Sequence, residues 1–120
     1  VGLAAPQIGQ NLNLAIIYLE EAGLPAFPII DPVIIKTSKE TTEMEEGCLS
    51  TPGLFGKVKR PKKITIEAYN VEGEKFTITD DTFLARVIQH EIDHLKNTLI
   101  IDKFEEITTG KELLKKYQDK

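Results

Sequence analysis

The two histidines of the chain lie four residues apart, in the segment HEIDH at positions 90–94. Apolar residues recur at helical spacing around this segment, so the sequence predicts an α-helix over residues 82–96. Residues four apart project from the same side of a helix, and His90 and His94 can therefore bind one metal ion, with Glu91 beside them as an acid or base. Two structural histidines on a core helix are the alternative, but the lack of any other histidine favours the metal site.

A third ligand is needed, because catalytic metal sites usually have three from the protein. There is no third histidine, so the candidates are a carboxylate and the single cysteine, Cys48. Thiolate binds iron(II), zinc and cobalt, although a lone cysteine is more often a small buried residue. The segment EGCLS at positions 46–50 contains a glycine, which would let the backbone approach a metal or substrate closely. Spacing alone leaves this choice open.

Before the predicted helix, the chain has the β-branched and alternating patterns of strands. The segments with this character are 12–19, 29–30, 33–37, 63–69 and 75–79. Asp31-Pro32 interrupts one of them, which predicts an edge strand or a bulge. Asn70 to Glu74 contains Gly73 and separates the last two, which predicts a hairpin.

The helical segments complete the predicted architecture. Asp80 or Asp81 can cap the start of the histidine-bearing helix, whose apolar residues on more than one side predict that other elements surround it. Thr109 and Glu112 have the spacing of a capping box, which predicts a final amphipathic helix. The whole pattern predicts an α+β fold, with mostly antiparallel sheets around a central metal-binding helix and a C-terminal helix.

Composition and charge exclude several classes of protein. At 120 residues the chain suits one domain, and its net charge of −4 gives no drive toward nucleic acid. The basic cluster within residues 57–63 is interpreted as a solvated turn. No apolar run reaches the roughly 20 residues of a membrane span, and no signal-peptide pattern opens the sequence. A protein that is neither membrane-embedded nor secreted is expected.

Three segments resemble the signature motifs of peptide deformylases: GLAAPQIG at positions 2–9, EGCLS at 46–50 and QHEIDHL at 89–95. They occur in the family's order and with similar separations, and the resemblance runs from Val1 to about Asp102. It implies a hydrolase that removes the N-formyl group from N-formylmethionyl peptides of nascent proteins and releases formate. Residues 1–120 would form a single catalytic domain that lacks the family's N-terminal segment.

The resemblance also implies a metal and the roles of the residues around it. The ligands of one divalent ion would be Cys48, His90 and His94, with Fe²⁺ as the native metal and Zn²⁺, Ni²⁺ or Co²⁺ as substitutes. Glu91 would serve as general base and then acid, while the side chain of Gln7 and the backbone N–H of Leu49 would stabilise the oxyanion. The residues at positions that line the methionine pocket in the family are Val1, Phe83, Arg86 and Val87. The backbone of Gly2 and Gly47 would pair with the extended substrate.

Arg60 takes the place of a family arginine that pairs with the acid at Glu46, so an ion pair bracing the Cys48 segment is expected. In some deformylases the C-terminal region docks on the ribosome. An ordinary packing helix is the simpler interpretation, and a transient ribosome contact is the alternative. The expected location is the cytoplasm of a bacterial-type cell, or an organelle's stroma or matrix.

Two other functions remain open at this point. A zinc peptidase would use His90, Glu91 and His94 with a downstream acid, and Glu105 or Glu106 would qualify if the helix continued for about three turns. A degenerate or truncated family member would bind metal or formyl-peptide without turnover.

Overall fold

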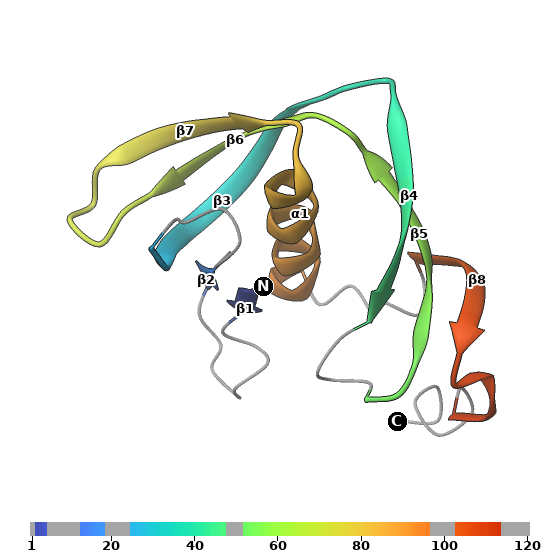
Figure 1. Ribbon diagram of the computed structural model, residues 1–120. Helices are drawn as coiled ribbons and strands as arrows, with labels where there is room; N and C mark the ends of the chain where they lie inside the picture. Colours follow the sequence, from blue (N-terminus) through green and yellow to red (C-terminus); the bar gives the residue numbers. More distant parts are fainter. Residues whose placement is uncertain (1, 5–12, 19–24, 48–51, 97–102, 114–120) are drawn as a thin grey trace.

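The computed structural model describes residues 2–4, 13–18, 25–47, 52–96 and 103–113. They form two antiparallel sheets with one helix, α1 (Phe83–Leu95), between them (Figure 1). The larger sheet has the strand order β1-β2-β3-β6-β7, and the smaller has the order β4-β5-β8. This arrangement confirms the expected α+β class and the central position of the histidine-bearing helix.

The expected strand segments all belong to the larger sheet. Its strands are β1 (Gly2–Ala4), β2 (Leu14–Ile17), β3 (Phe27–Thr37), β6 (Ile64–Tyr69) and β7 (Lys75–Asp80). The smaller sheet consists of β4 (Thr41–Gly47), β5 (Phe55–Pro61) and β8 (Phe104–Thr109), followed by the 3-10 turn η4 (Lys111–Leu113). The sequence patterns thus predict four strands of the larger sheet and miss all three strands of the smaller one.

The interruption at Asp31-Pro32 is a bulge. Ile30 pairs with Tyr69 and Val33 with Glu67, so β3 has one residue more than β6 over this stretch. Asp31 has a φ of 49°, and its N–H donates to the carbonyl of Asn13 at 2.8 Å. Because β3 lies between β2 and β6, the bulge is inside the sheet and the edge-strand alternative is wrong.

The β6–β7 hairpin has the turn that its sequence predicts. Gly73 has a φ of 81°, which a residue without Cβ adopts without strain. Oδ1 of Asn70 accepts from the N–H of Glu72 at 3.0 Å and from that of Glu74 at 2.9 Å. The side chain of Asn70 therefore holds the turn closed and sets the register of the two strands.

Helix α1 begins one residue later than predicted. The N-cap is Thr82 and not Asp80 or Asp81 as expected, and the Thr82 side chain accepts from the N–H of Leu84 at 3.3 Å. Asp80 lies outside the cap, yet its Oδ2 accepts from the N–H of Ala85 at 2.9 Å and from Thr82 Oγ1 at 2.7 Å. The two residues together satisfy amides that the first helical turn leaves without partners.

The apolar core lies between α1 and the larger sheet. The helix contributes Ala85, Val87, Ile88 and Ile92 to this cluster. The sheet contributes Ala15, Ile17, Ile29, Ile64, Ile66 and Ala68. Burial of one isoleucine side chain is worth about 1.5–3 kcal/mol, so this face fixes the position of the helix on the sheet.

The structure corrects two other expectations, the turn at the basic cluster and the start of the final helix. Residues 57–60 of the basic cluster belong to β5 rather than to a turn; Lys57 and Lys59 are exposed as expected, and Arg60, for which a pair with Glu46 was expected instead, is only 4% exposed. The final helix does not begin at Thr109, which is the last residue of β8. Residues 114–120 lie outside the described part of the chain. Among the described helices none is long and apolar enough to span a membrane.

Candidate metal centre

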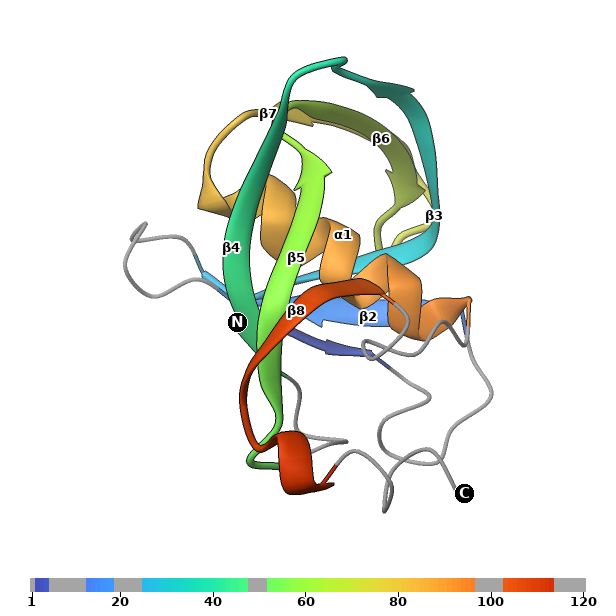
Figure 2. The ribbon, with the colours of Figure 1, turned by 90° about the vertical axis from the view of Figure 1, so that its right-hand side faces the viewer.

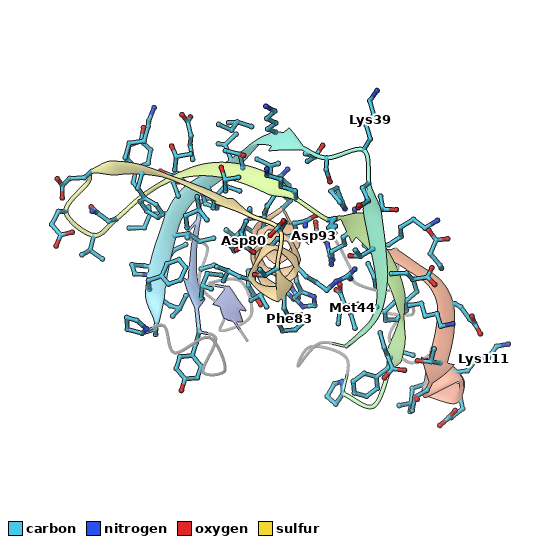
Figure 3. The ribbon with its side chains drawn as sticks, turned by 45° about the horizontal axis from the view of Figure 1, so that its top comes forward. Lys39, Met44, Asp80, Phe83, Asp93 and Lys111 are labelled. Carbon is cyan, nitrogen blue, oxygen red and sulfur yellow. The ribbon has the colours of Figure 1, made fainter. Side chains whose placement is uncertain are left out.

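The side of α1 that faces the smaller sheet is polar and largely buried. Figure 2 shows β4 and β5 crossing over this side of the helix. The buried polar residues of this layer are Glu46, Arg60, Arg86 and Gln89. Gln89 donates to the carbonyl of Pro61 at 3.0 Å, and Arg60 Nη1 donates to Oδ2 of Asp93 at 2.8 Å. Asp93 points from α1 toward the smaller sheet (Figure 3), so hydrogen bonds connect this sheet to the helix.

The carboxylate of Glu46, near the end of β4, is the centre of this layer. Its Oε2 accepts from Arg60 Nε at 2.8 Å and from Nη1 of Arg86. Its Oε1 accepts from Arg60 Nη2 at 2.8 Å and lies 3.0 Å from Nδ1 of His90. The expected Glu46–Arg60 ion pair is confirmed, and it is bidentate. A carboxylate offers about four acceptor sites, so these four contacts occupy it fully.

The environment of Glu46 keeps it ionised. Burial by itself would raise the pKa of this carboxyl group, but hydrogen bonds from Arg60, His90 and Arg86 outweigh it and lower the pKa to about 2. Burial would likewise lower the pKa of Arg60, and the contacts with Glu46 and Asp93 raise it instead. Glu46 is therefore a carboxylate at neutral pH.

This ionisation assigns the tautomer of His90. A carboxylate only accepts hydrogen bonds, so the proton between Glu46 Oε1 and His90 Nδ1 belongs to the imidazole. In a neutral ring the other nitrogen, Nε2, then has the lone pair. A carboxylate behind a histidine fixes the orientation of the ring and increases its basicity as a metal ligand.

The two imidazoles converge as the HEIDH spacing predicts. Nε2 of His90 lies 3.1 Å from Nε2 of His94, and the ring centroids are 4.9 Å apart with the planes at 64°. Two histidine nitrogens on one tetrahedral zinc-like ion, at about 2.05 Å each, stand about 3.3 Å apart. The pair therefore fits two ligands of a single metal ion.

The rest of the expected metal site is outside what the structure describes. Cys48 and Leu49 are among residues 48–51, and Val1 and Gln7 are also outside the described ranges. Within those ranges, no group of three histidine, cysteine or acidic side chains could hold a metal ion. Glu91 is 3% exposed and adjacent in sequence to His90 on α1.

The expected substrate-binding residues lie at several places in the fold. Gly2 belongs to β1 and Gly47 to β4; each strand is one of the two edges of its sheet among the described strands, and they lie on opposite sides of α1 (Figure 1). Phe83 is 46% exposed at the start of α1, whereas Val87 is buried in the core cluster. The guanidinium of Arg86 is in the Glu46 cluster, so only its aliphatic stem is left to line a pocket.

Met44 is a candidate substrate-binding residue that sequence reasoning missed. It shares one face of β4 with Thr42 and Glu46, both of which contact side chains of α1, and it lies toward the helix in Figure 3. It is nevertheless 44% exposed, which places an accessible apolar side chain near Glu46. The alternation of residues 42, 44 and 46 would have identified it if this acidic segment had been recognised as a strand.

Comparison with known proteins agrees with this geometry. The sequence model of the family described as polypeptide deformylase matches residues 1–109. The chain belongs to the polypeptide deformylase family. Members of this family depend on a metal ion and remove N-formyl groups from nascent peptides.

The similarity to individual deformylases extends over most of the chain. The peptide deformylase of Borreliella burgdorferi is 46% identical over 117 residues, which cover 98% of this chain and 70% of that protein. The crystal structure of a peptide deformylase from Synechococcus elongatus, in complex with actinonin, superposes with a TM-score of 0.82 at 39% identity. That of the Thermotoga maritima enzyme gives 0.81 at 39% identity. Both alignments cover 88% of this chain, but 58% and 69% of those two chains.

The zinc-peptidase alternative loses its geometric basis. It requires α1 to continue toward Glu105 and Glu106, but the helix ends at Leu95. Both glutamates instead belong to β8, where Glu106 lies 3.6 Å from Lys57 in an exposed ion pair. Neither side chain is on the helix that bears the histidines.

Proposed function

We propose that this chain hydrolyses the N-formyl group of N-formylmethionyl peptides of nascent proteins and releases formate. The observation that carries the proposal is the convergence of His90 Nε2 and His94 Nε2 at 3.1 Å, with Glu46 behind His90, in a member of the deformylase family. Because the alignments leave part of the relatives' length uncovered, the activity of this chain itself is the quantity to measure.

The metal would be held by His90, His94 and Cys48, with Fe²⁺ as the native ion. Two imidazoles and one thiolate bind iron, zinc, nickel or cobalt, so the ligand types limit the native metal to these ions but do not select one of them. When bound, the ion would supply Lewis acidity toward the formyl oxygen and the attacking water. Substitution Cys48→Ala should lower the metal content of the purified protein, and an unchanged content would remove Cys48 from the site.

The residues beside the metal would move protons and stabilise charge. Glu91 would take a proton from the attacking water and deliver it to the departing amine nitrogen, so that C–N cleavage does not expel an anion. Negative charge develops on the formyl oxygen during the attack, and the side-chain amide of Gln7 and the N–H of Leu49 would donate to it. Loss of one such donor typically lowers a rate by about 10²–10³-fold.

The substrate would bind as an extended strand. Gly2 and Gly47 lie on outermost strands, where a peptide backbone can add to a sheet, and glycine lets it approach closely. The residues proposed to receive the methionine side chain are Val1, Phe83, Val87 and the stem of Arg86. The exposed side chain of Met44 would extend this apolar surface, since it lies on the face of β4 that carries Glu46.

We also propose that the protein acts in the cytoplasm, or in an organelle's stroma or matrix, where nascent formylated chains occur. For the C-terminal residues, an ordinary packing role is the simpler proposal, and a transient ribosome contact is the alternative. Ribosome co-sedimentation that is unaffected by removal of the residues after Thr109 would eliminate that contact.

A single assay distinguishes the candidate activities. Formate release is measured from formyl-Met-Ala-Ser under anaerobic conditions with iron- or nickel-loaded protein, beside the same peptide without the formyl group. Activity confined to the formylated peptide supports a deformylase. Cleavage of internal bonds would indicate a peptidase, and no reaction with either peptide would indicate a family member that binds without turnover.

A further inference from the structure

Glu46 is held by two arginines from different elements, and the guanidinium of the second, Arg86, has no assigned task in the proposed reaction, in which only the aliphatic stem of Arg86 lines the pocket. Arg86 is 5% exposed and lies on α1, four residues before His90. Residues at this spacing share one side of a helix. Both side chains reach the same carboxylate, Arg86 at Oε2 and His90 at Oε1. One turn of α1 therefore contacts Glu46 twice.

Arg86 also bonds to both neighbouring strands of the smaller sheet. Its Nη2 donates to the carbonyl of Thr42 at 2.7 Å and to Thr42 Oγ1 at 3.0 Å, on β4. Its Nη1 donates to the carbonyl of Val58 at 3.1 Å, on β5. A planar guanidinium with fixed donor directions can satisfy such a set, which an ammonium group cannot span. These bonds fix the distance between α1 and β4 on one side of His90.

Arg60 provides the matching connection on the other side. It binds Glu46 through two nitrogens and Asp93 through a third, and Asp93 lies three residues after His90 on α1. The helix is therefore tied to the smaller sheet both before and after the histidine. Burying an ion pair seldom stabilises a fold more than an apolar pair of similar volume would. The geometry of the cluster accordingly points to a role in orientation beyond a contribution to stability.

We propose that Arg86 is a positioning residue: it holds β4 and α1 at the separation at which Glu46 Oε1 accepts the Nδ1 proton of His90. This contact fixes the rotation of the imidazole and directs Nε2 toward the point where Nε2 of His94 converges with it. The inference rests on the proposed function only in that these two nitrogens are taken as ligands of the metal. It does not require knowledge of which peptide is hydrolysed.

The test compares Arg86→Met, Arg86→Lys and Thr42→Val with the exposed control Lys59→Met on β5. Two readouts are independent of turnover: the Nδ1 proton signal of His90 in the NMR spectrum of the metal-free protein, and Co²⁺ binding followed by its visible absorption bands. Arg86→Met is expected to weaken Co²⁺ binding by about 10-fold or more, shift the bands and abolish the protected proton signal. Arg86→Lys should be intermediate, and Lys59→Met should match the wild type.

Thr42→Val keeps Arg86 and removes one of its acceptors, so it is expected to change the same readouts in the same direction by a smaller factor. If Arg86→Met lowers only thermal stability and leaves the proton signal, Co²⁺ affinity and bands unchanged, the proposal is overturned. If Arg86→Met does not fold, unchanged readouts in Thr42→Val overturn it. A wild-type protein that releases no formate, but whose Co²⁺ bands respond to Arg86, would refute the proposed function and leave the positioning role standing.

Discussion

Oε1 of Glu46 on β4 lies 3.0 Å from Nδ1 of His90 on α1, although the two residues are 44 positions apart in the chain. This contact joins the smaller sheet to the helix that supplies both histidines. It also makes Nε2 the lone-pair nitrogen of His90, because an ionised carboxylate can only accept. Much of the behaviour of the candidate site should therefore depend on Glu46, which is not one of the three proposed metal ligands.

Glu46→Gln should strongly destabilise the protein. The substitution keeps the shape of the side chain but leaves the buried guanidinium groups of Arg60 and Arg86 without their shared negative charge. Loss of one partner of a buried ion pair typically costs about 3–5 kcal/mol. Urea unfolding of the metal-free protein measures this change. The control is Glu40→Gln, since Glu40 lies 3.6 Å from Lys62 in an exposed pair and should change stability by less than about 1 kcal/mol. Equal effects of the two substitutions would contradict the expectation.

The stability of the fold should fall at acid pH in a window that Glu46 sets. Its pKa is lowered from 4.5 to about 2 in the folded protein, so the unfolded chain takes up a proton first as the pH decreases. The stabilisation is complete above about pH 4.5 and is lost progressively down to about pH 2, a difference of about 3 kcal/mol. Urea unfolding at a series of pH values should show this slope in the wild type and in Glu40→Gln. If the Glu46→Gln protein retains the whole dependence of unfolding free energy on pH, other titrating groups cause it.

Glu91→Ala should separate metal binding from turnover. If Glu91 transfers protons and is not a ligand, the variant should retain the metal content of the wild type and lose at least about 10²-fold in kcat for formyl-Met-Ala-Ser. Elemental analysis and formate release measure the two quantities on the same preparation. Glu105→Ala, at an exposed position on β8, is the control and should leave both unchanged. A fully active Glu91→Ala protein would refute the proposed proton transfer.

Gly56→Ala should weaken the pairing of β5 with β8. A Cβ at Gly56 would lie 2.5 Å from Cγ of Phe104 and 2.8 Å from the carbonyl oxygen of Glu106. Relief of such overlap requires movement of the β8 backbone, and overpacking of this kind typically costs about 1–3 kcal/mol. The free energy of unfolding should fall by that amount, while Lys59→Ala, exposed on the same strand, should change it by less than about 0.5 kcal/mol. Equal free energies of unfolding for Gly56→Ala and Lys59→Ala would show that the β8 backbone can move away from residue 56 without a loss of stability.

The parts of the fold that sequence reasoning predicted have local signals. The period of the apolar residues in α1, the alternation in β6 and β7, and the turn residues Asn70 and Gly73 all act over a few neighbouring positions. The β3 bulge is similarly marked by Asp31-Pro32. In each case the residues that determine the geometry are adjacent in the chain, so their pattern predicts the structure.

The smaller sheet has no such signal, because its inward positions do not follow the usual apolar pattern. Glu46 on β4 and Gly56 and Arg60 on β5 face the interior, although charged residues and glycine normally indicate surface or loop. The two charged side chains are buried because each is paired with charged groups on other elements, and Gly56 is buried because Phe104 and the β8 backbone lie close against it. The Glu46–Arg60 pair is the one feature of this sheet that was expected before the structure, and that expectation came from the family resemblance and not from the pattern of residues.

The sequence by itself determined that His90 and His94 share one side of a helix, since the spacing of four residues and the helical repeat suffice for that. Only the tertiary structure decided which side chains contact His90 from the smaller sheet and hold it in place. It placed Glu46 against His90, two arginines on that carboxylate and Arg60 against Asp93, all across separations of 14 to 44 residues. The physical reason is that a helix orients neighbours through its own geometry, whereas buried charges are matched only when distant segments pack together.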